Sequence, residues 1–206
     1  RFGEFHSRKT EKQNSLKQET SKLLVLGDSF TFGILLPDGK TYVDRLQKHF
    51  QNEYEIINAA VGGWGASDYT KYVELFCDKI KPEQIFIYLS YGDIDRSVIN
   101  SLYTLNNEGQ IETGKGHKTS KLKIYLNNFR PSYQFLLESS HLVQMARAAL
   151  LSLFENYLGI VIGARQKVES SIDFEDSLIL GKKLFLKIKS DAEKCGADLK
   201  VFNTAW

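Results

Sequence analysis

A short apolar run that ends in a glycine-containing turn is the feature that most constrains the fold of this chain. Residues 22–26 (KLLVL) are bounded by polar residues and suit a strand buried on both faces of a parallel sheet. The turn GDSFTFG (27–33) follows directly and puts Ser29 at the end of that strand. In open α/β sheets, ligands bind outside the carboxyl ends of the strands. Ser29 is therefore a candidate for the site of chemistry.

Strand and helix patterns alternate after this turn. Residues 41–50 and 69–80 carry apolar side chains at helical spacing, and residues 54–58 and 84–89 are short runs of strand-forming side chains. This alternation predicts βαβ units and an α/β fold with a parallel central sheet.

The pattern is less regular in the second half of the chain. Residues 95–129 predict an insertion that could form a rim or a lid, with a small hairpin around the turn at 106–109. Residues 132–163 are mostly helical in pattern, residues 172–195 predict a further amphipathic helix, and residues 199–202 predict a fourth strand.

Length and composition suit one domain. A chain of 206 residues, of which 42% are hydrophobic, can bury a sizeable core. Residues 1–21 are rich in Lys, Glu, Gln, Ser and Thr and show little apolar periodicity, which predicts a polar arm or linker. We expect the folded domain to comprise residues 22–206.

Charge and hydropathy limit the partners and the location of the chain. Its net charge of +2 arises from 27 basic and 25 acidic residues spread along the sequence, which argues against a nucleic-acid-binding surface. The longest apolar stretch, residues 148–164, is interrupted by Glu155 and Asn156, so it predicts a buried helix rather than a membrane span. The chain begins at Arg1, which is compatible with removal of an N-terminal signal or anchor. We expect a cell-envelope or secreted location rather than a cytoplasmic one.

The two cysteines do not suggest a metal site. Cys77 and Cys195 lie far apart and have no CxxC or Cys/His spacing. Two buried thiols are the simplest interpretation, and a disulfide is the alternative. No metal and no organic cofactor are predicted.

Three glycine-containing turns each follow a predicted strand, so they are expected to meet at one crevice. The first is residues 27–33, the second is residues 58–65 (NAAVGGWG) and the third is residues 90–95 (SYGDID). In the first turn, the backbone N–H of Ser29 can stabilise a developing negative charge. In the second turn, glycine permits close approach of the backbone to a ligand, and Gly63 is the candidate N–H donor.

Further side chains of these turns are candidates for ligand binding. They are Asp28, Gly62, Trp64 and Tyr91. Asp93 puts a carboxyl group beside the same crevice. The structural alternatives are that Asp28 or Ser29 only caps backbone N–H groups, that the glycines form a plain loop, and that Asp93 is a turn residue.

Two of these segments resemble the conserved blocks of the SGNH hydrolases, also called the GDSL lipase/esterase family. GDSFTFG after an apolar strand is similar to the family's first block, and NAAVGGWGAS (58–67), at the expected distance, is similar to its second block. The resemblance implies a flavodoxin-like, three-layer α/β/α fold and ester cleavage. It also implies that Ser29 is the nucleophile and that the N–H of Gly63 belongs to the oxyanion hole.

The third turn departs from the family pattern. Where the family has Asn after Gly, this chain has Gly92-Asp93. An ionised carboxylate would repel the oxyanion, and loss of one donor of this kind costs about 2.7–4 kcal/mol. A protonated Asp93 could still donate. Alternatively, a one-residue gap removes the Asn and leaves Asp93 equivalent to the aspartate that often follows it.

The family's general base is also missing from the sequence. No Asp-x-x-His follows Ser29, and the four histidines are His6, His49, His117 and His141. Without a base, a serine hydroxyl is a poor nucleophile at neutral pH. The chain ends at Trp206, just past the last predicted strand, and we expect the native protein to continue into the loop that carries the base. The 206-residue chain is then expected to be a weak catalyst or none.

Two functions of different classes remain open. The first is a serine esterase or O-acyltransferase that acts on acyl or acetyl esters of a lipid or saccharide. The alternative is a catalytically silent module of the same fold that binds a glycan or a protein in a cell-envelope assembly. Nucleotide binding is disfavoured because the first turn is neither GxGxxG nor GxxxxGK[ST]. The oligomeric state cannot be predicted from these patterns.

Overall fold

The computed structural model describes residues 4–8, 20–50, 53–90, 92–114, 116 and 174–203. The chain divides into two compact units, one formed by residues 1–116 and 173–206 and the other by residues 117–172. Only the first contains described residues. The predicted helical region at 132–163 and the binding candidate Tyr91 lie outside the described part.

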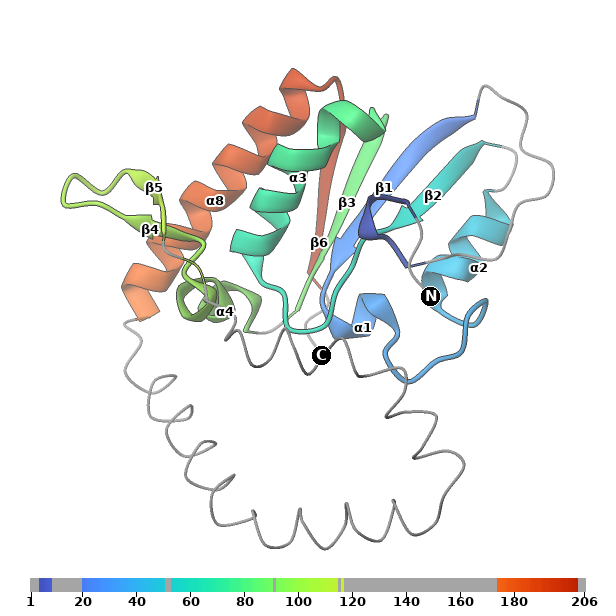
Figure 1. The fold of residues 1–206 in the computed structure, drawn as a ribbon, viewed down its shortest axis with the longest axis horizontal. Helices are drawn as coiled ribbons and strands as arrows, with labels where there is room; N and C mark the ends of the chain where they lie inside the picture. The colour runs from blue at the N-terminus through green and yellow to red at the C-terminus, as the bar shows by residue number, and fades with distance from the viewer. Residues whose placement is uncertain are drawn as a thin grey trace, which may run out of the picture. The chain divides into compact units, whose positions relative to one another are not determined.

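The core of the first unit is a four-stranded parallel sheet (Figure 1). Its strands are β1 (Ser21–Gly27), β2 (Tyr54–Asn58), β3 (Gln84–Leu89) and β6 (Asp198–Asn203). Their order across the sheet is β2-β1-β3-β6, with every neighbouring pair parallel. This is the flavodoxin-like order, in which the chain reverses direction across the sheet between β1 and β3 and leaves a crevice at their carboxyl ends.

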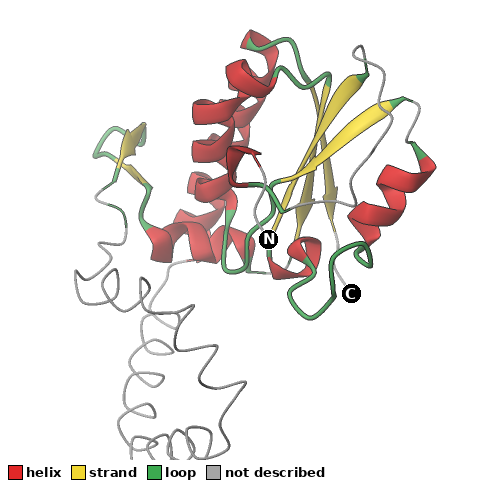
Figure 2. Ribbon diagram, turned by 45° about the vertical axis from the view of Figure 1, so that its right-hand side comes forward, coloured by secondary structure: helices red, strands yellow, loops and turns green. Residues whose placement is uncertain are grey.

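Helices cover both faces of this sheet (Figure 2). Helices α3 (Ala66–Ile80) and α8 (Phe174–Lys194) pack on one face, and α2 (Tyr42–His49) packs on the other. The short α1 (Ser29–Phe32) follows β1, and α4 (Asp93–Asn100) packs on α3 and α8. Side chains of β1 alternate between the two cores: Leu24 and Leu26 pack with α3 and α8, whereas Leu23 and Val25 pack with α2. All four are at most 3% exposed, as a strand buried on both faces requires. The predicted three-layer α/β/α fold is confirmed.

Helix α1 was not predicted, and two further helices differ from the prediction by more than their end residues. Helix α3 begins at Ala66 rather than at residue 69, because Asp68 accepts a hydrogen bond from the N–H of Gly65 at 2.9 Å and so stabilises the first turn. Helix α4 was not predicted at all. The predicted hairpin is present as β4 (Tyr103–Leu105) and β5 (Ile111–Thr113), which pair antiparallel.

Part of the stretch predicted as an arm or linker packs on the domain. Residues Glu4–His6 form a 3-10 helix, and the N–H of Arg8 donates to the carbonyl of Asn58 at 2.7 Å. The Arg8 guanidinium is buried and donates to the carbonyls of Gly33 and Leu36, each at 2.7 Å. These bonds hold the chain that follows α1.

The expectation of two separate cysteine thiols is wrong for this structure. Cys77 and Cys195 form a disulfide, with their Cα atoms 6.0 Å apart. Helices α3 and α8 pack against each other, which brings together two positions that are 118 residues apart in the chain. Among the described residues, no helix is long and apolar enough to span a bilayer.

Candidate active site

The first turn holds Ser29 at the carboxyl end of β1. Asp28 caps α1, and its Oδ1 accepts a hydrogen bond from the N–H of Phe30 at 2.9 Å. Ser29 is the first residue of α1 and is partly exposed. Within the described part of the chain, neither its hydroxyl nor its N–H makes a hydrogen bond to the protein. Both groups are therefore free to contact a ligand.

The second turn lies against Ser29. A Cβ built on Gly62 would lie 3.5 Å from the Cβ of Ser29, which is ordinary contact. Gly63 is exposed and has a φ of +83°, a conformation that favours glycine. Its N–H has no acceptor among the described residues. The structure thus brings the candidate nucleophile and the candidate donor segment together.

The third turn buries the Asp93 carboxyl group among donors. Its Oδ2 accepts from the Tyr69 hydroxyl at 2.9 Å and from the N–H of Ser90 at 2.8 Å. Its Oδ1 accepts from Nη1 of Arg96 at 2.6 Å and lies 3.0 Å from the hydroxyl of Ser90. Burial raises the pKa of Asp93, and the hydrogen bonds from Ser90 and Tyr69 and the charge of Arg96 oppose that rise.

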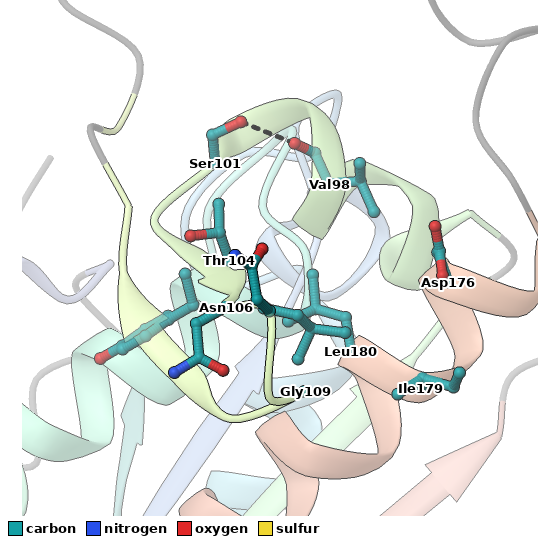
Figure 3. A pocket seen from close by; sticks show the side chains of 11 residues that line it. Val98, Ser101, Thr104, Asn106, Gly109, Asp176, Ile179 and Leu180 are labelled. Carbon is teal, nitrogen blue, oxygen red and sulfur yellow. Dashed lines mark hydrogen bonds between the residues drawn. The ribbon is translucent and has the colours of Figure 1, made fainter.

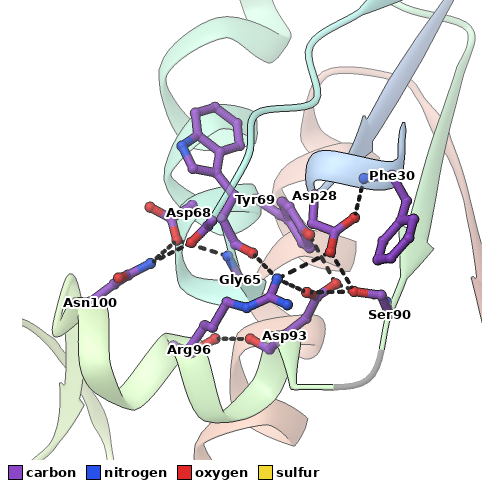
Figure 4. A network of polar contacts seen from close by, with 12 residues as sticks. Asp28, Phe30, Gly65, Asp68, Tyr69, Ser90, Asp93, Arg96 and Asn100 are labelled. Carbon is purple, nitrogen blue, oxygen red and sulfur yellow. Dashed lines mark hydrogen bonds and ion pairs between the residues drawn. The ribbon is translucent and has the colours of Figure 1, made fainter. Parts of the chain in front are cut away.

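This placement bears on the two interpretations of Asp93. Both of its carboxylate oxygens point at protein donors, and the residue is 0% exposed (Figure 4). The Asp93 carboxyl group is therefore held by protein donors on both oxygens.

The binding candidates are placed differently from one another. Asp28 is 1% exposed, and its Oδ2 accepts from the hydroxyl of Ser90 at 2.7 Å and from Arg96 at 3.2 Å. The Trp64 ring is half-buried and packs on Tyr72, with ring centroids 5.8 Å apart. Asp28 and the Trp64 ring therefore contact other protein side chains and support the three turns. Gly62, in contrast, is exposed beside Ser29.

The histidines do not supply a base to Ser29 within the described residues. The His6 ring packs edge-on against Phe76, and the His49 ring packs against Phe50. His117 and His141 lie outside the described residues.

Sequence reasoning missed Arg96, Ser90 and Tyr69, which hold Asp28 and Asp93. Asp93 and Arg96 have the i,i+3 spacing of a helical ion pair. This ion pair can be predicted from the sequence only if residues 93–100 are first assigned to a helix. The contact of Arg96 with Asp28 joins residues that are 68 positions apart, and no local pattern encodes it.

A separate pocket of about 530 Å³ lies between the hairpin β4–β5, α4 and α8 (Figure 3). Leu105, Ile179 and Leu180 contribute apolar surface to it, and none of its lining residues belongs to the three turns. No group of three or more His, Cys, Asp or Glu side chains in the described ranges is placed to hold a metal ion.

No protein-family model and no curated protein matches this chain. Similar solved structures include TesA, at 26% identity over 37% of this chain and 44% of that chain, with a TM-score of 0.35. They also include AlinE4, an SGNH-hydrolase family esterase, at 27% identity over 39% of this chain and 46% of that chain, with a TM-score of 0.35. The psychrotrophic esterase EstA from Pseudoalteromonas sp. is 14% identical over 88% of this chain and 77% of that chain, with a TM-score of 0.32. The matched region spans less than half of TesA and of AlinE4. The chain is similar to esterases of the SGNH hydrolase family.

Proposed function

We propose that this chain is a serine esterase or O-acyltransferase domain in which Ser29 is the nucleophile. The observation that carries the proposal is the meeting of Ser29 with the second turn at the β1/β3 crevice, with its hydroxyl and N–H unengaged by other described residues. The substrate class that we propose is an acyl or acetyl ester of a lipid or saccharide.

The reaction proceeds by acyl transfer. The Oγ of Ser29 attacks the ester carbonyl carbon, and its proton passes to a base. The N–H groups of Ser29 and Gly63 hold the oxyanion, and the leaving alcohol departs when its bond to the carbonyl carbon breaks. Water or a sugar hydroxyl then takes the acyl group from the serine.

The base in this proposal is a histidine other than His6 and His49, because those two rings pack on Phe76 and Phe50. General base catalysis of this kind contributes about 10²–10⁴-fold to the rate. With the family's Asn removed by a one-residue gap in the third turn, the oxyanion hole has one donor fewer, which corresponds to about 10²–10³-fold lower turnover than in a complete site.

A silent binding module is the second candidate. Two observations favour it: the Asp93 carboxyl group is already held by protein donors, and neither described histidine supplies a base to Ser29. In that case the crevice would bind a glycan or a protein without breaking a bond.

Turnover of p-nitrophenyl acetate separates the two candidates. We expect p-nitrophenol release above background from the wild type and its loss in Ser29→Ala. Ser21→Ala is the matched control, because Ser21 lies at the opposite end of the same strand. If Ser29→Ala releases p-nitrophenol as fast as the wild type does, the esterase proposal fails and the binding module is favoured.

We also propose a cell-envelope or secreted location. The disulfide between Cys77 and Cys195 supports it, because disulfides persist in oxidising compartments. Fractionation of the source cells, with detection of the chain in the envelope or the medium, tests the location; recovery in the cytoplasm would contradict it.

A further inference from the structure

One nitrogen of Arg96 reaches all three turns of the site (Figure 4). Nη1 lies 2.6 Å from Oδ1 of Asp93 in the third turn and 3.2 Å from Oδ2 of Asp28 in the first turn. It also lies 3.1 Å from the carbonyl oxygen of Trp64 in the second turn. Arg96 comes from α4, so this helix is connected to every loop of the candidate active site.

The two carboxyl groups that Arg96 contacts need a counter-charge. Asp28 is 1% exposed and Asp93 is 0% exposed, and ionised groups this deeply buried are stable only when paired. The Ser90 hydroxyl lies 2.7 Å from Asp28 and 3.0 Å from Asp93, but its single hydrogen serves one of them at a time. Arg96 is the cation that pairs with both among the described residues.

Helix α4 also packs closely against the second turn. A Cβ on Gly65 would overlap the carbonyl oxygen of Asp93 and lie 3.0 Å from the Cβ of Arg96. At the other end of the helix, Asn100 donates to the carbonyl of Gly63 at 3.4 Å. A shift of α4 would therefore move the residues that flank the candidate oxyanion donor.

We propose that Arg96 is a positioning residue that sets the distance between the nucleophile and the oxyanion donor. It holds Asp28, which caps α1 beside Ser29, and it holds Trp64, which follows Gly63 directly. Arg96 acts through these residues and touches no reacting atom. The proposal rests on the proposed function of Ser29.

The test uses three variants of the full chain. Arg96→Met removes the charge and keeps most of the length of the side chain. Arg96→Lys keeps the charge, and its ammonium has three hydrogens for three acceptors that converge on one nitrogen. Arg45→Met is the matched control, because Arg45 is an exposed arginine of α2, outside the three turns.

The first measurement is the second-order rate constant for labelling of Ser29 by a fluorophosphonate. We expect Arg96→Met to label about 10- to 100-fold more slowly than the wild type, because misplacement by about 1 Å has an effect of this size. Arg96→Lys should recover most of the rate, and Arg45→Met should match the wild type. Equal rates for Arg96→Met and the wild type would overturn the proposal while leaving Ser29 as the nucleophile.

The second measurement does not depend on the reactivity of Ser29. Amide hydrogen exchange should accelerate together at Phe30, Gly65 and Ser90 in Arg96→Met, since one lies in each of the three turns and their N–H groups donate to the carboxylates of Asp28, Asp68 and Asp93. Lys81, whose N–H donates to the carbonyl of Cys77 at the far end of α3, should keep its protection. Faster exchange at Ser90 alone would overturn the proposal. If the wild type does not label, the proposed function fails, and the exchange data still decide whether Arg96 joins the turns.

Arg96→Met leaves two buried carboxyl groups without a counter-charge, so it can fail to fold. The double variant Arg96→Met/Asp93→Asn then replaces it, because it removes one of those charges together with the guanidinium. Asp93→Asn alone is its reference. The double variant is expected to show the slower labelling and the faster exchange relative to that reference, and no difference between the two would overturn the proposal.

Discussion

The hydroxyl of Ser90 lies 2.7 Å from Oδ2 of Asp28 and so connects the carboxyl end of β3 to the carboxyl end of β1. These are the two strands between which the chain reverses direction across the sheet. The contact therefore fixes the edge of the crevice that holds Ser29.

Ser90→Ala should lower the free energy of unfolding by about 1–3 kcal/mol, because buried carboxylate oxygens of Asp28 and Asp93 lose a donor. Urea unfolding at pH 7 measures the change. Ser21→Ala, at the far end of β1, should stay within about 0.5 kcal/mol of the wild type. Equal effects of the two substitutions would show that the Ser90 contact adds nothing to stability.

Gly65→Ala should destabilise the domain by about 1–3 kcal/mol, since the added methyl group would overlap the carbonyl of Asp93 and force the second turn away from α4. Gly62→Ala provides the comparison, because a Cβ there meets Ser29 at an ordinary 3.5 Å. Thermal unfolding of both variants gives the difference. A Gly65→Ala protein as stable as Gly62→Ala would mean that the two turns are not in close contact.

We expect the free energy of unfolding to fall in acid because the Glu74 carboxylate becomes protonated. Desolvation acts to raise its pKa, but hydrogen bonds from Lys71 and Tyr103 and the charge of Lys187 outweigh it and lower the pKa from 4.5 to about 2. Because the folded state holds the proton less tightly than the unfolded state, this contribution is complete above pH 4.5 and is lost as the pH falls towards 2.

Urea unfolding of the wild type and Glu74→Gln between pH 2 and pH 7 tests this sign. The difference in unfolding free energy between the two proteins should shrink as the pH falls through that window. The effect should be modest, because the Glu74 side chain is 35% exposed and solvent screens its ion pairs. A difference that does not change with pH would contradict the assignment.

The disulfide should contribute measurably to stability. Cys195→Ser is expected to cost about 2–5 kcal/mol, and the double variant Cys77→Ser/Cys195→Ser should cost little more, because either change breaks the same bond. Intact mass after alkylation without reductant gives an independent check. Modification of both cysteines in the folded wild-type protein would show that they are thiols.

The sheet could be predicted because its signals are local. Residues 23–26 are apolar on both faces, and β1 does bury Leu23 and Val25 on one side and Leu24 and Leu26 on the other. Strand β3 was predicted with the bounds that the structure shows, since residues 84–89 are dense in strand-forming side chains and follow Pro82.

The framework around Ser29 could not be predicted in the same way. Helix α4 was missed because its eight residues are largely polar and carry no long apolar pattern. Its role depends on the contacts of Arg96 with Asp28 and Trp64, which join distant parts of the chain. Motif spacing predicted which loops meet, whereas the side chains that hold them together are visible only in three dimensions.

Labelling with a fluorophosphonate, followed by intact mass and peptide mapping, decides whether Ser29 is the nucleophile. We expect one adduct per chain, located on Ser29 and absent from Ser29→Ala, with Ser21→Ala labelled as the wild type is. No adduct on the folded wild-type protein, or an adduct that persists in Ser29→Ala, would contradict the claim that Ser29 is the nucleophile.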